Sequence, residues 1–343
     1  MQFSGRACHC DPSWPRHFVH SESLRETAAL VLDWDCNVRP RERKQAPERA
    51  LAEHAARLTD GAIVHVKTDR LPAFAAHVLP SLRARIVLVT GDSDCSAPGA
   101  QRALLDDPRI HHWFAQNCDL ADRHDKLTRI PIGLDNPIYT KADKRLGFLV
   151  TMALGRTPLD LTLRKNDLGQ QGVLAAVAAE LPPTHARPLR ALCTFHQSGK
   201  IVRADVSRIS EREAALRTLQ SRDVCSVLPR RLPQLECWRL HGELAFEVSP
   251  RGNGLDCFRT WEALALGTIP IVKTSTLDPL YRDEQLPVVI VRDWDEITQD
   301  ALARWHAELA PRFDAALERK LSHEHWAGKI SAAAERAREG RCE

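Results

Sequence analysis

Arg259 and Glu262 lie one helical turn apart in the segment FRTWEALA, so that both side chains share one face of a helix. A guanidinium offers a planar fork of hydrogen-bond donors that fits phosphate oxygens. A carboxylate one turn further along can accept hydrogen bonds from adjacent hydroxyls, such as those of a ribose. The alternative is an ordinary surface ion pair, worth roughly a few tenths of a kcal/mol. We predict that Arg259 binds a diphosphate and that Glu262 binds the adjoining sugar.

The turn before this helix also favours an anion site. It contains Gly252, Asn253 and Gly254, between the strand LAFEVSP and the helix DCFRTWEALALG. Glycine permits a positive φ or a close approach of the backbone to a ligand. The free amides of a helix start and the positive end of the helix dipole attract anions such as a diphosphate. We therefore assign these turn residues to the same binding site.

Two further basic residues are candidates for contact with the same diphosphate. Lys273 ends the strand IPIVK, and Arg203 lies with Lys200 in the glycine-containing loop FHQSGKIVR. The alternative for each is a solvated surface charge. We include Lys273 and Arg203 in the predicted binding site.

Asp92 and Asp94 follow the strand RIVLV in the segment VTGDSDCS. Because ligands of open parallel sheets lie beyond the carboxyl ends of the strands, we predict that these carboxylates are catalytic and that one accepts a proton from a hydroxyl substrate. A D-x-D manganese site for a nucleotide diphosphate is one alternative, and the cap of a turn is another. Lys67 and Asp69 end a neighbouring strand in HVKTD and are candidates for the same cleft.

Two series of strands and helices must position these residues. Continuous apolar runs such as AIVHVK and RIVLVTG predict parallel sheets that are covered on both faces. We therefore expect an α/β protein in which two Rossmann-like parallel-sheet domains face a cleft. The expected divisions are an irregular N-terminal arm (1–24), a first α/β domain (25–165), a connecting helix (166–183) and a second α/β domain with C-terminal helices (184–343).

The segment FEVSPRGNGLDCFRTWEALALGTIPIV resembles the exostosin-like glycosyltransferases. Their nucleotide-sugar domain contains an F-x-x-x-P-x-G strand and turn, followed by R-x-x-E-A-L-x-x-G-x-I-P-V. The segments IPIGLD and LPVVIVRDWDEIT are weaker similarities to glycosyltransferases. The matching positions of the main motif are Phe246, Pro250, Gly252, Arg259, Glu262, Ala263, Leu264, Gly267, Ile269, Pro270 and Ile271.

The resemblance implies a GT-B-like transferase in glycan biosynthesis that moves a sugar from a nucleotide-diphosphate sugar to a glycan or other hydroxyl acceptor. The donor would bind the second domain and the acceptor the first. The reaction would be inverting, with no cofactor and no bound metal. The alternatives are a non-catalytic carbohydrate- or nucleotide-binding protein of the same fold and a metal-dependent D-x-D transferase.

Composition excludes several other classes. The net charge of +3 is small against 48 basic and 45 acidic residues, so nucleic acid is not an expected partner. No apolar run is long enough to span a membrane, so we expect a cytoplasmic protein, or a Golgi protein if a leader is missing. The 10 cysteines are expected to be reduced thiols, with Cys8–His9–Cys10 as an alternative site for a soft metal.

Overall fold

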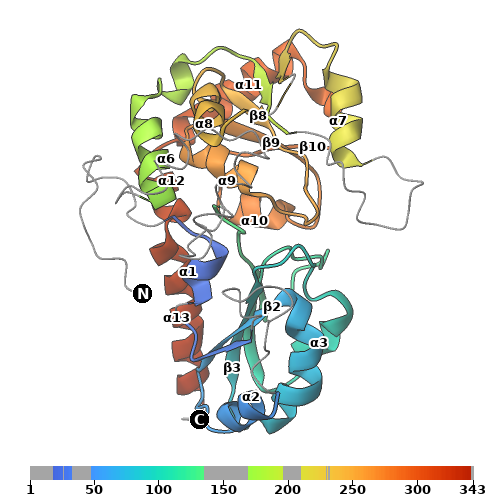
Figure 1. The fold of residues 1–343 in the computed structure, drawn as a ribbon, viewed down its shortest axis with the longest axis vertical. Helices are drawn as coiled ribbons and strands as arrows, with labels where there is room; N and C mark the ends of the chain where they lie inside the picture. The colour runs from blue at the N-terminus through green and yellow to red at the C-terminus, as the bar shows by residue number, and fades with distance from the viewer. Residues whose placement is uncertain are drawn as a thin grey trace, which may run out of the picture.

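The computed structural model of the chain describes residues 18–25, 27–32, 48–134, 169–195, 210–228, 230 and 232–340. These residues form two α/β domains, the lower and upper lobes in Figure 1. Each domain is built on a five-stranded parallel sheet. The expected architecture of two Rossmann-like domains is therefore confirmed. Lys200, Arg203 and the Cys8–His9–Cys10 triplet lie outside the described residues.

The sheet of the first domain has the strand order β1-β2-β3-β4-β5. Every residue of β3 is buried, as are the first four residues of β2. This is the reason for their continuous apolar sequences, because helices cover both faces of a parallel sheet. The strands are β1 (Leu30–Leu32), β2 (Ile63–Lys67), β3 (Ile86–Gly91), β4 (Ile110–Ala115) and β5 (Leu127–Arg129).

The apolar pattern of LPAFAAHVLPSLRA favours one helix, but the helical hydrogen bonding changes along the segment. Pro72 and Pro80 each lie in the first turn of a short helical piece. Proline lacks an amide hydrogen and its ring crowds the preceding turn, so a regular α-helix cannot continue through Pro80. The pieces are α3 (Leu71–Ala73), the π-helical η2 (Phe74–Val78) and the 3₁₀ η3 (Leu79–Ser81). The segment GAQRALLDD likewise forms a 3₁₀ helix, η4 (Gly99–Leu105).

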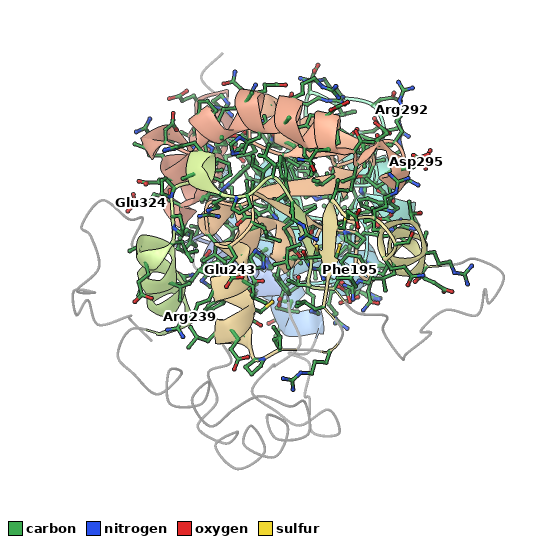
Figure 2. The ribbon with its side chains drawn as sticks, turned by 90° about the horizontal axis from the view of Figure 1, so that it is seen from above. Phe195, Arg239, Glu243, Arg292, Asp295 and Glu324 are labelled. Atoms are coloured by element: carbon green, nitrogen blue, oxygen red, sulfur yellow. The ribbon has the colours of Figure 1, made fainter. Side chains whose placement is uncertain are left out.

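The sheet of the second domain has the order β10-β9-β8-β6-β7. Successive side chains of β8 point to opposite faces. Phe246 and Val248 enter the apolar core beside Ile271, whereas Glu247 points to the other face. Side chains fill the space between this sheet and its helices (Figure 2). The strands are β6 (Ala191–Cys193), β7 (Cys225–Val227), β8 (Phe246–Val248), β9 (Ile269–Lys273) and β10 (Val289–Val291).

A capping serine and a proline mark two of the helix boundaries. Ser210 caps α7 by accepting a hydrogen bond from the Glu213 amide, as the spacing of serine and glutamate in SERE favours. The helix predicted in QQGVLAAVAAELPP is α6, which ends before Pro182. The remaining α-helices are α1 (Ser21–Arg25), α2 (Glu48–Ala55), α6 (Gly169–Glu180), α7 (Glu211–Leu219), α8 (Gln234–His241), α9 (Phe258–Ala265), α10 (Asp278–Asp283), α11 (Gln299–Leu309), α12 (Ala315–Leu321) and α13 (His323–Glu339). The short 3₁₀ segments are η1 (Thr68–Arg70), η5 (Thr184–Ala186), η6 (Trp294–Glu296) and η7 (Ala310–Arg312).

Helix α13 leaves the second domain and packs on the first sheet, where it contacts β3 and β4 (Figure 1). Arg85, just before β3, donates a hydrogen bond to the Ala337 carbonyl at 2.5 Å. The C-terminal helices, expected within 184–343, therefore contact both domains. In the part of the chain that the structure describes, none of the helices is long and apolar enough to cross a membrane.

Candidate functional site

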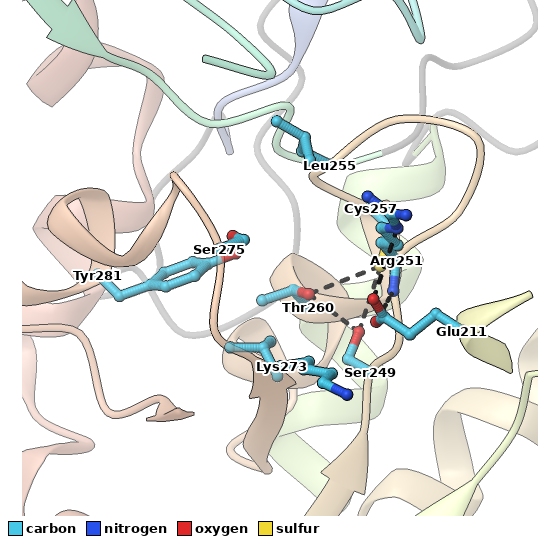
Figure 3. Close-up of a pocket in the computed structure, with 10 residues that line it drawn as sticks. Glu211, Ser249, Arg251, Leu255, Cys257, Thr260, Lys273, Ser275 and Tyr281 are labelled. Carbon is cyan, nitrogen blue, oxygen red and sulfur yellow. Dashed lines mark hydrogen bonds and ion pairs between the residues drawn. The ribbon is translucent and has the colours of Figure 1, made fainter. Parts of the chain in front are cut away.

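The carboxyl ends of β8 and β9 and the start of α9 surround a small pocket of about 20 Å³ (Figure 3). This edge of a parallel sheet is where ligands of open α/β domains bind. The pocket is strongly polar, with two basic side chains and several hydroxyls. Its lining residues are Glu211, Ser249, Arg251, Leu255, Cys257, Thr260, Val272, Lys273, Ser275 and Tyr281.

The two basic residues of the pocket are each paired with a carboxylate. Arg251 Nε lies 3.5 Å from Glu211 Oε2, and Lys273 Nζ lies 2.9 Å from Asp293 Oδ1. The Arg251 side chain is 54% exposed and that of Asp293 is 71% exposed. An ion pair as exposed as that of Asp293 contributes about 0–1 kcal/mol, so a phosphate group could replace Asp293 at little cost. Glu211 is held more firmly, because it is 19% exposed and also accepts a hydrogen bond from the Arg251 amide at 2.9 Å. Sequence reasoning identified Lys273 but missed Arg251, although Arg251 directly precedes the glycine turn.

Hydrogen bonds connect two hydroxyls and one thiol of the pocket. Ser249 Oγ lies 2.9 Å from Thr260 Oγ1 and 3.2 Å from Cys257 Sγ (Figure 3). Ser249 follows β8, whereas Cys257 is the N-cap residue of α9 and Thr260 lies in its first turn. These contacts hold the helix start against the end of the strand, so that the first amides of α9 lie beside the pocket.

Arg259 is not among the described residues that line the pocket, and its side chain is only 14% exposed. Its Nη1 donates to the Pro250 carbonyl at 3.3 Å and approaches Cys257 Sγ at 3.7 Å. The guanidinium carbon is 5.5 Å from the centre of the Phe195 ring. Arg259 thus borders the pocket through Cys257, and within the described part of the chain Nη2 has no partner. The fourth neighbour of the guanidinium is Glu247, whose Oε1 lies 3.7 Å from Nε.

Glu262 lies one turn further along α9 and is half-buried. It accepts a hydrogen bond from Gln234 Nε2 of α8 at 3.0 Å. Glu262 is not among the described residues that line the pocket. The predicted sharing of one ligand by Arg259 and Glu262 therefore stays a prediction.

The glycines of the turn allow neighbouring side chains to approach the backbone closely, and they do not adopt a positive φ. Neither Gly252 nor Gly254 has a positive φ, unlike Gly267 at the end of α9. A Cβ on Gly254 would lie 2.9 Å from the side-chain amide atoms of Asn117, a residue of the first domain. Gly252 is less crowded, with Arg212 Nη2 at 3.2 Å from the position of a Cβ. The turn is therefore packed against the opposite domain.

Asp256 was not identified from the sequence as a site residue, yet it is buried at the start of α9. Its Oδ1 accepts hydrogen bonds from the Cys257 amide at 2.9 Å and from Trp261 Nε1 at 3.0 Å. Its Oδ2 accepts from the Ile132 amide of the first domain at 2.9 Å. Burial raises the pKa of Asp256 to about 6, although these hydrogen bonds oppose the shift. The carboxylate of Asp256 therefore lies just before α9. The signal in the sequence was an aspartate at the start of the predicted helix DCFRTWEALALG, because carboxylates are favourable at helix starts.

A larger cavity of about 360 Å³ lies between the domains. Its walls include both predicted catalytic aspartates and a residue from the start of α9. The two domains therefore face a cleft, as expected. The lining residues are Lys67, Asp69, Asp92, Ser93, Asp94, Ile132 and Phe258.

Asp94 contacts the glycine turn directly. Its Oδ2 accepts a hydrogen bond from Asn253 Nδ2 at 3.2 Å. Asp94 belongs to the first domain and Asn253 to the second, so this hydrogen bond crosses the cleft between them. Asn253 is thus oriented toward the first domain.

Asp92 is held by basic residues of the first domain. Its Oδ2 lies 3.7 Å from Arg25 Nη1 and 3.8 Å from Lys67 Nζ. Its backbone has a positive φ of 54°, and its amide donates to Gln116 Oε1 at 2.9 Å. A hydrogen-bonded loop therefore fixes Asp92 at the edge of β3.

Asp69 is the third carboxylate of the cleft. Its Oδ1 accepts from Ser93 Oγ at 2.9 Å and from Cys95 Sγ at 3.0 Å. Burial acts to raise the pKa of Asp69, but the hydrogen bonds and the nearby Lys67 outweigh it and lower the pKa. Asp69 thus carries a negative charge at neutral pH. Among the described residues, no group of three or more His, Cys, Asp or Glu side chains is arranged to hold a metal ion.

Hydrogen bonds from loops of both domains keep the cleft in this arrangement. Asn117 donates from Nδ2 to the Ser93 carbonyl at 2.8 Å, and its Oδ1 accepts from the Asp256 amide at 2.8 Å. Arg129 Nε donates to the Thr276 carbonyl at 2.7 Å. Because Asn117 is buried and contacts both loops, it sets the distance between the cleft aspartates and the glycine turn.

No protein-family model matches the chain, and no curated protein matches it. Among solved structures, the α,α-trehalose-phosphate synthase (UDP-forming) from Burkholderia vietnamiensis has a TM-score of 0.41 and 14% identity over 86% of this chain and 76% of that chain. A structure described as "Trehalose-6-phosphate from E. coli bound with UDP-2-fluoro glucose" has a TM-score of 0.41 and 14% identity over 84% of this chain and 77% of that chain. Likeness at this level carries no argument about activity.

Proposed function

We propose that this chain is a glycosyltransferase that moves a sugar from a nucleotide-diphosphate sugar to a glycan or other hydroxyl acceptor. The observation that carries the proposal is the contact of Asp94 with Asn253 at 3.2 Å, which joins a cleft carboxylate to the glycine turn of the second domain. A basic pocket and a carboxylate on opposite sides of one cleft are what transfer between two bound substrates requires.

The donor diphosphate would lie at the carboxyl ends of β8 and β9. Arg251, Lys273 and the first amides of α9 would bind its oxygens, and Arg259 would bind them from behind the Cys257 side chain. Negative charge builds up on the departing diphosphate as the bond to the sugar breaks. These fixed donors would therefore stabilise the transition state more than the ground state.

The acceptor would occupy the cavity between the domains. Asp94 would accept the proton of the attacking hydroxyl, because it faces the turn at which the donor sugar begins. Asp92, paired with Arg25 and Lys67, would position the loop and the acceptor. The same proposal includes inverting stereochemistry and independence from metal. It also includes contact of Glu262 with the ribose and of Arg203 with the diphosphate.

The motif from Phe246 to Ile271 supports membership of the exostosin-like glycosyltransferases as the finer proposal. The non-catalytic alternative would leave the cleft without a carboxylate facing the motif. The contact between Asp94 and Asn253 counts against that alternative.

Incubation of the purified chain with a panel of nucleotide sugars, followed by mass spectrometry, tests the proposal. We expect one donor to release its nucleoside diphosphate, with sugar transferred to water or to an added glycan. Binding without turnover for every donor and acceptor would favour the non-catalytic alternative. No binding of any nucleotide sugar would overturn the donor site.

A further inference from the structure

Glu247 is a fully buried acid in the middle of β8, with an exposed fraction of 0%. Its Oε1 accepts hydrogen bonds from Thr194 Oγ1 at 2.5 Å and from the Thr194 amide at 3.3 Å. Its Oε2 is buried and has no partner among the described residues. An ionised carboxylate with one oxygen unpartnered in a dry interior is costly, so this arrangement suits a neutral carboxyl group.

The same Oε1 lies 3.7 Å from Arg259 Nε. Thr194 follows β6, which pairs with β8 through Leu192 and Glu247. Phe195, the next residue, packs on the Arg259 guanidinium. Glu247 of β8 thus lies beside one edge of the guanidinium, and Phe195, which follows β6, lies against one face. Arg259 Nη1 points toward Pro250 and Cys257 at the pocket.

The charged and titratable groups that face Glu247 come from three neighbouring elements. Arg259 and Glu262 lie on α9, Cys237 lies on α8, and Cys193 lies on β6. Burial raises the pKa of Glu247 to about 8, and the nearby Arg259 opposes that shift only in part. Burial also raises the pKa of Cys237 to about 12, so its thiol is neutral.

We propose that Glu247 is a positioning residue whose neutral carboxyl group holds the Arg259 guanidinium beside the turn 250–254 and leaves its positive charge available for a phosphate group. This rests on the proposed function in one respect, namely that the phosphate belongs to a nucleoside diphosphate. An ionised Glu247 would neutralise Arg259 across 3.7 Å and weaken its attraction for the ligand.

Calorimetric titration of the full chain with nucleoside diphosphates between about pH 7.5 and pH 9 tests this inference. Over this range the ligand phosphates are already ionised, so changes report on the protein. We expect the wild-type affinity to fall by about tenfold as the pH rises, and Glu247→Gln to abolish the fall. The matched control is Glu243→Gln, the same change at an exposed position after α8 (labelled in Figure 2), which should keep the wild-type fall.

A second variant keeps the test decisive if Glu247→Gln does not fold. The Thr194 hydrogen bonds lower the pKa of Glu247, so Thr194→Val should move the fall in affinity to higher pH. An equal fall in wild type and Glu247→Gln, or an unmoved fall in Thr194→Val, would overturn the positioning role.

Inorganic sulfate, which does not titrate in this range, separates this inference from the proposed function. Wild-type protein that binds sulfate with the same dependence on Glu247 but binds no nucleoside diphosphate would overturn the proposed donor and retain the positioning role. Protein that binds neither anion would overturn both.

Discussion

At the scale of single residues, Arg259 combines contacts that no other side chain can reproduce. Its Nε faces Glu247, its Nη1 reaches Pro250, and its flat face packs on Phe195. We expect Arg259→Lys to weaken the binding of nucleoside diphosphate by about tenfold or more, because a point charge cannot replace the fork. Isothermal titration calorimetry measures this, and an unchanged affinity would argue against a phosphate role for Arg259.

Asp94 provides a test that separates catalysis from binding. Asparagine at position 94 keeps a carbonyl oxygen that can accept from Asn253, but it cannot take up a proton. We therefore expect Asp94→Asn to lower kcat about 100-fold or more and to leave the affinity for nucleotide within about twofold. Steady-state kinetics and calorimetry on the same preparation decide this. Equal losses of turnover and affinity would mean that Asp94 acts on the donor.

The buried Glu247 also predicts how stability varies with pH. Burial raises its pKa from the ordinary value of 4.5 to about 8 in the folded chain, so the folded state retains a proton that the unfolded state loses. This contribution is fully present below about pH 4.5 and is lost as the pH rises toward about 8. Relative to Glu247→Gln, the wild type should lose stability across this window, on the order of a few kcal/mol. Urea denaturation at several pH values tests this, and parallel profiles would exclude a protonated Glu247.

At the scale of elements, the glycine turn is fixed by its packing against the first domain. Because a Cβ on Gly254 would lie 2.9 Å from Asn117, we expect Gly254→Ala to destabilise the protein by about 1–3 kcal/mol. The control is Gly328→Ala on α13, where a Cβ meets nothing within 4 Å. That change should stabilise the helix by about 0.5–1 kcal/mol. Thermal denaturation distinguishes the two, and a neutral Gly254→Ala would show that the turn can move away from Asn117.

At the scale of the whole molecule, metal-independent and metal-dependent transfer differ in whether the carboxylates of the cleft share a cation with the donor. Asp92 and Asp94 belong to the first domain and the expected donor site to the second, but Asp94 contacts the turn that precedes α9. The D-x-D alternative, in which Asp94 and the diphosphate hold a cation, is therefore the one to test.

We nevertheless expect turnover of the donor sugar to persist in excess chelator, because Arg251, Lys273 and Arg259 can meet the charge of the diphosphate. The assay is release of nucleoside diphosphate with and without chelator. Loss of activity with chelator, restored by manganese, would assign Asp94 to a metal site rather than to proton transfer.

Local sequence patterns predicted most elements of this protein, although not the three short helical pieces of residues 71–81. Continuous apolar runs such as RIVLVTG predicted buried parallel strands, because a strand covered on both faces has no solvent-facing side. The glycine turn predicted where α9 begins, and Ser210 caps α7, because capping and glycine effects act within a few residues. Lys273 ends β9 and Arg259 lies in the first turn of α9, so the sequence also predicted that both lie toward the carboxyl edge of the second sheet.

The contacts of the site residues depend on the tertiary structure. Glu247 reads as one polar residue in an apolar strand, and only the pairing of β6 with β8 brings Thr194 to it. Asn117 and Asp256 are far apart in sequence, and only the docking of the domains joins them. The covering of the first sheet by α13 likewise depends on the path of the chain between domains. Sequence patterns report local hydrogen bonding and burial, whereas these contacts depend on which surfaces the folded domains present to each other.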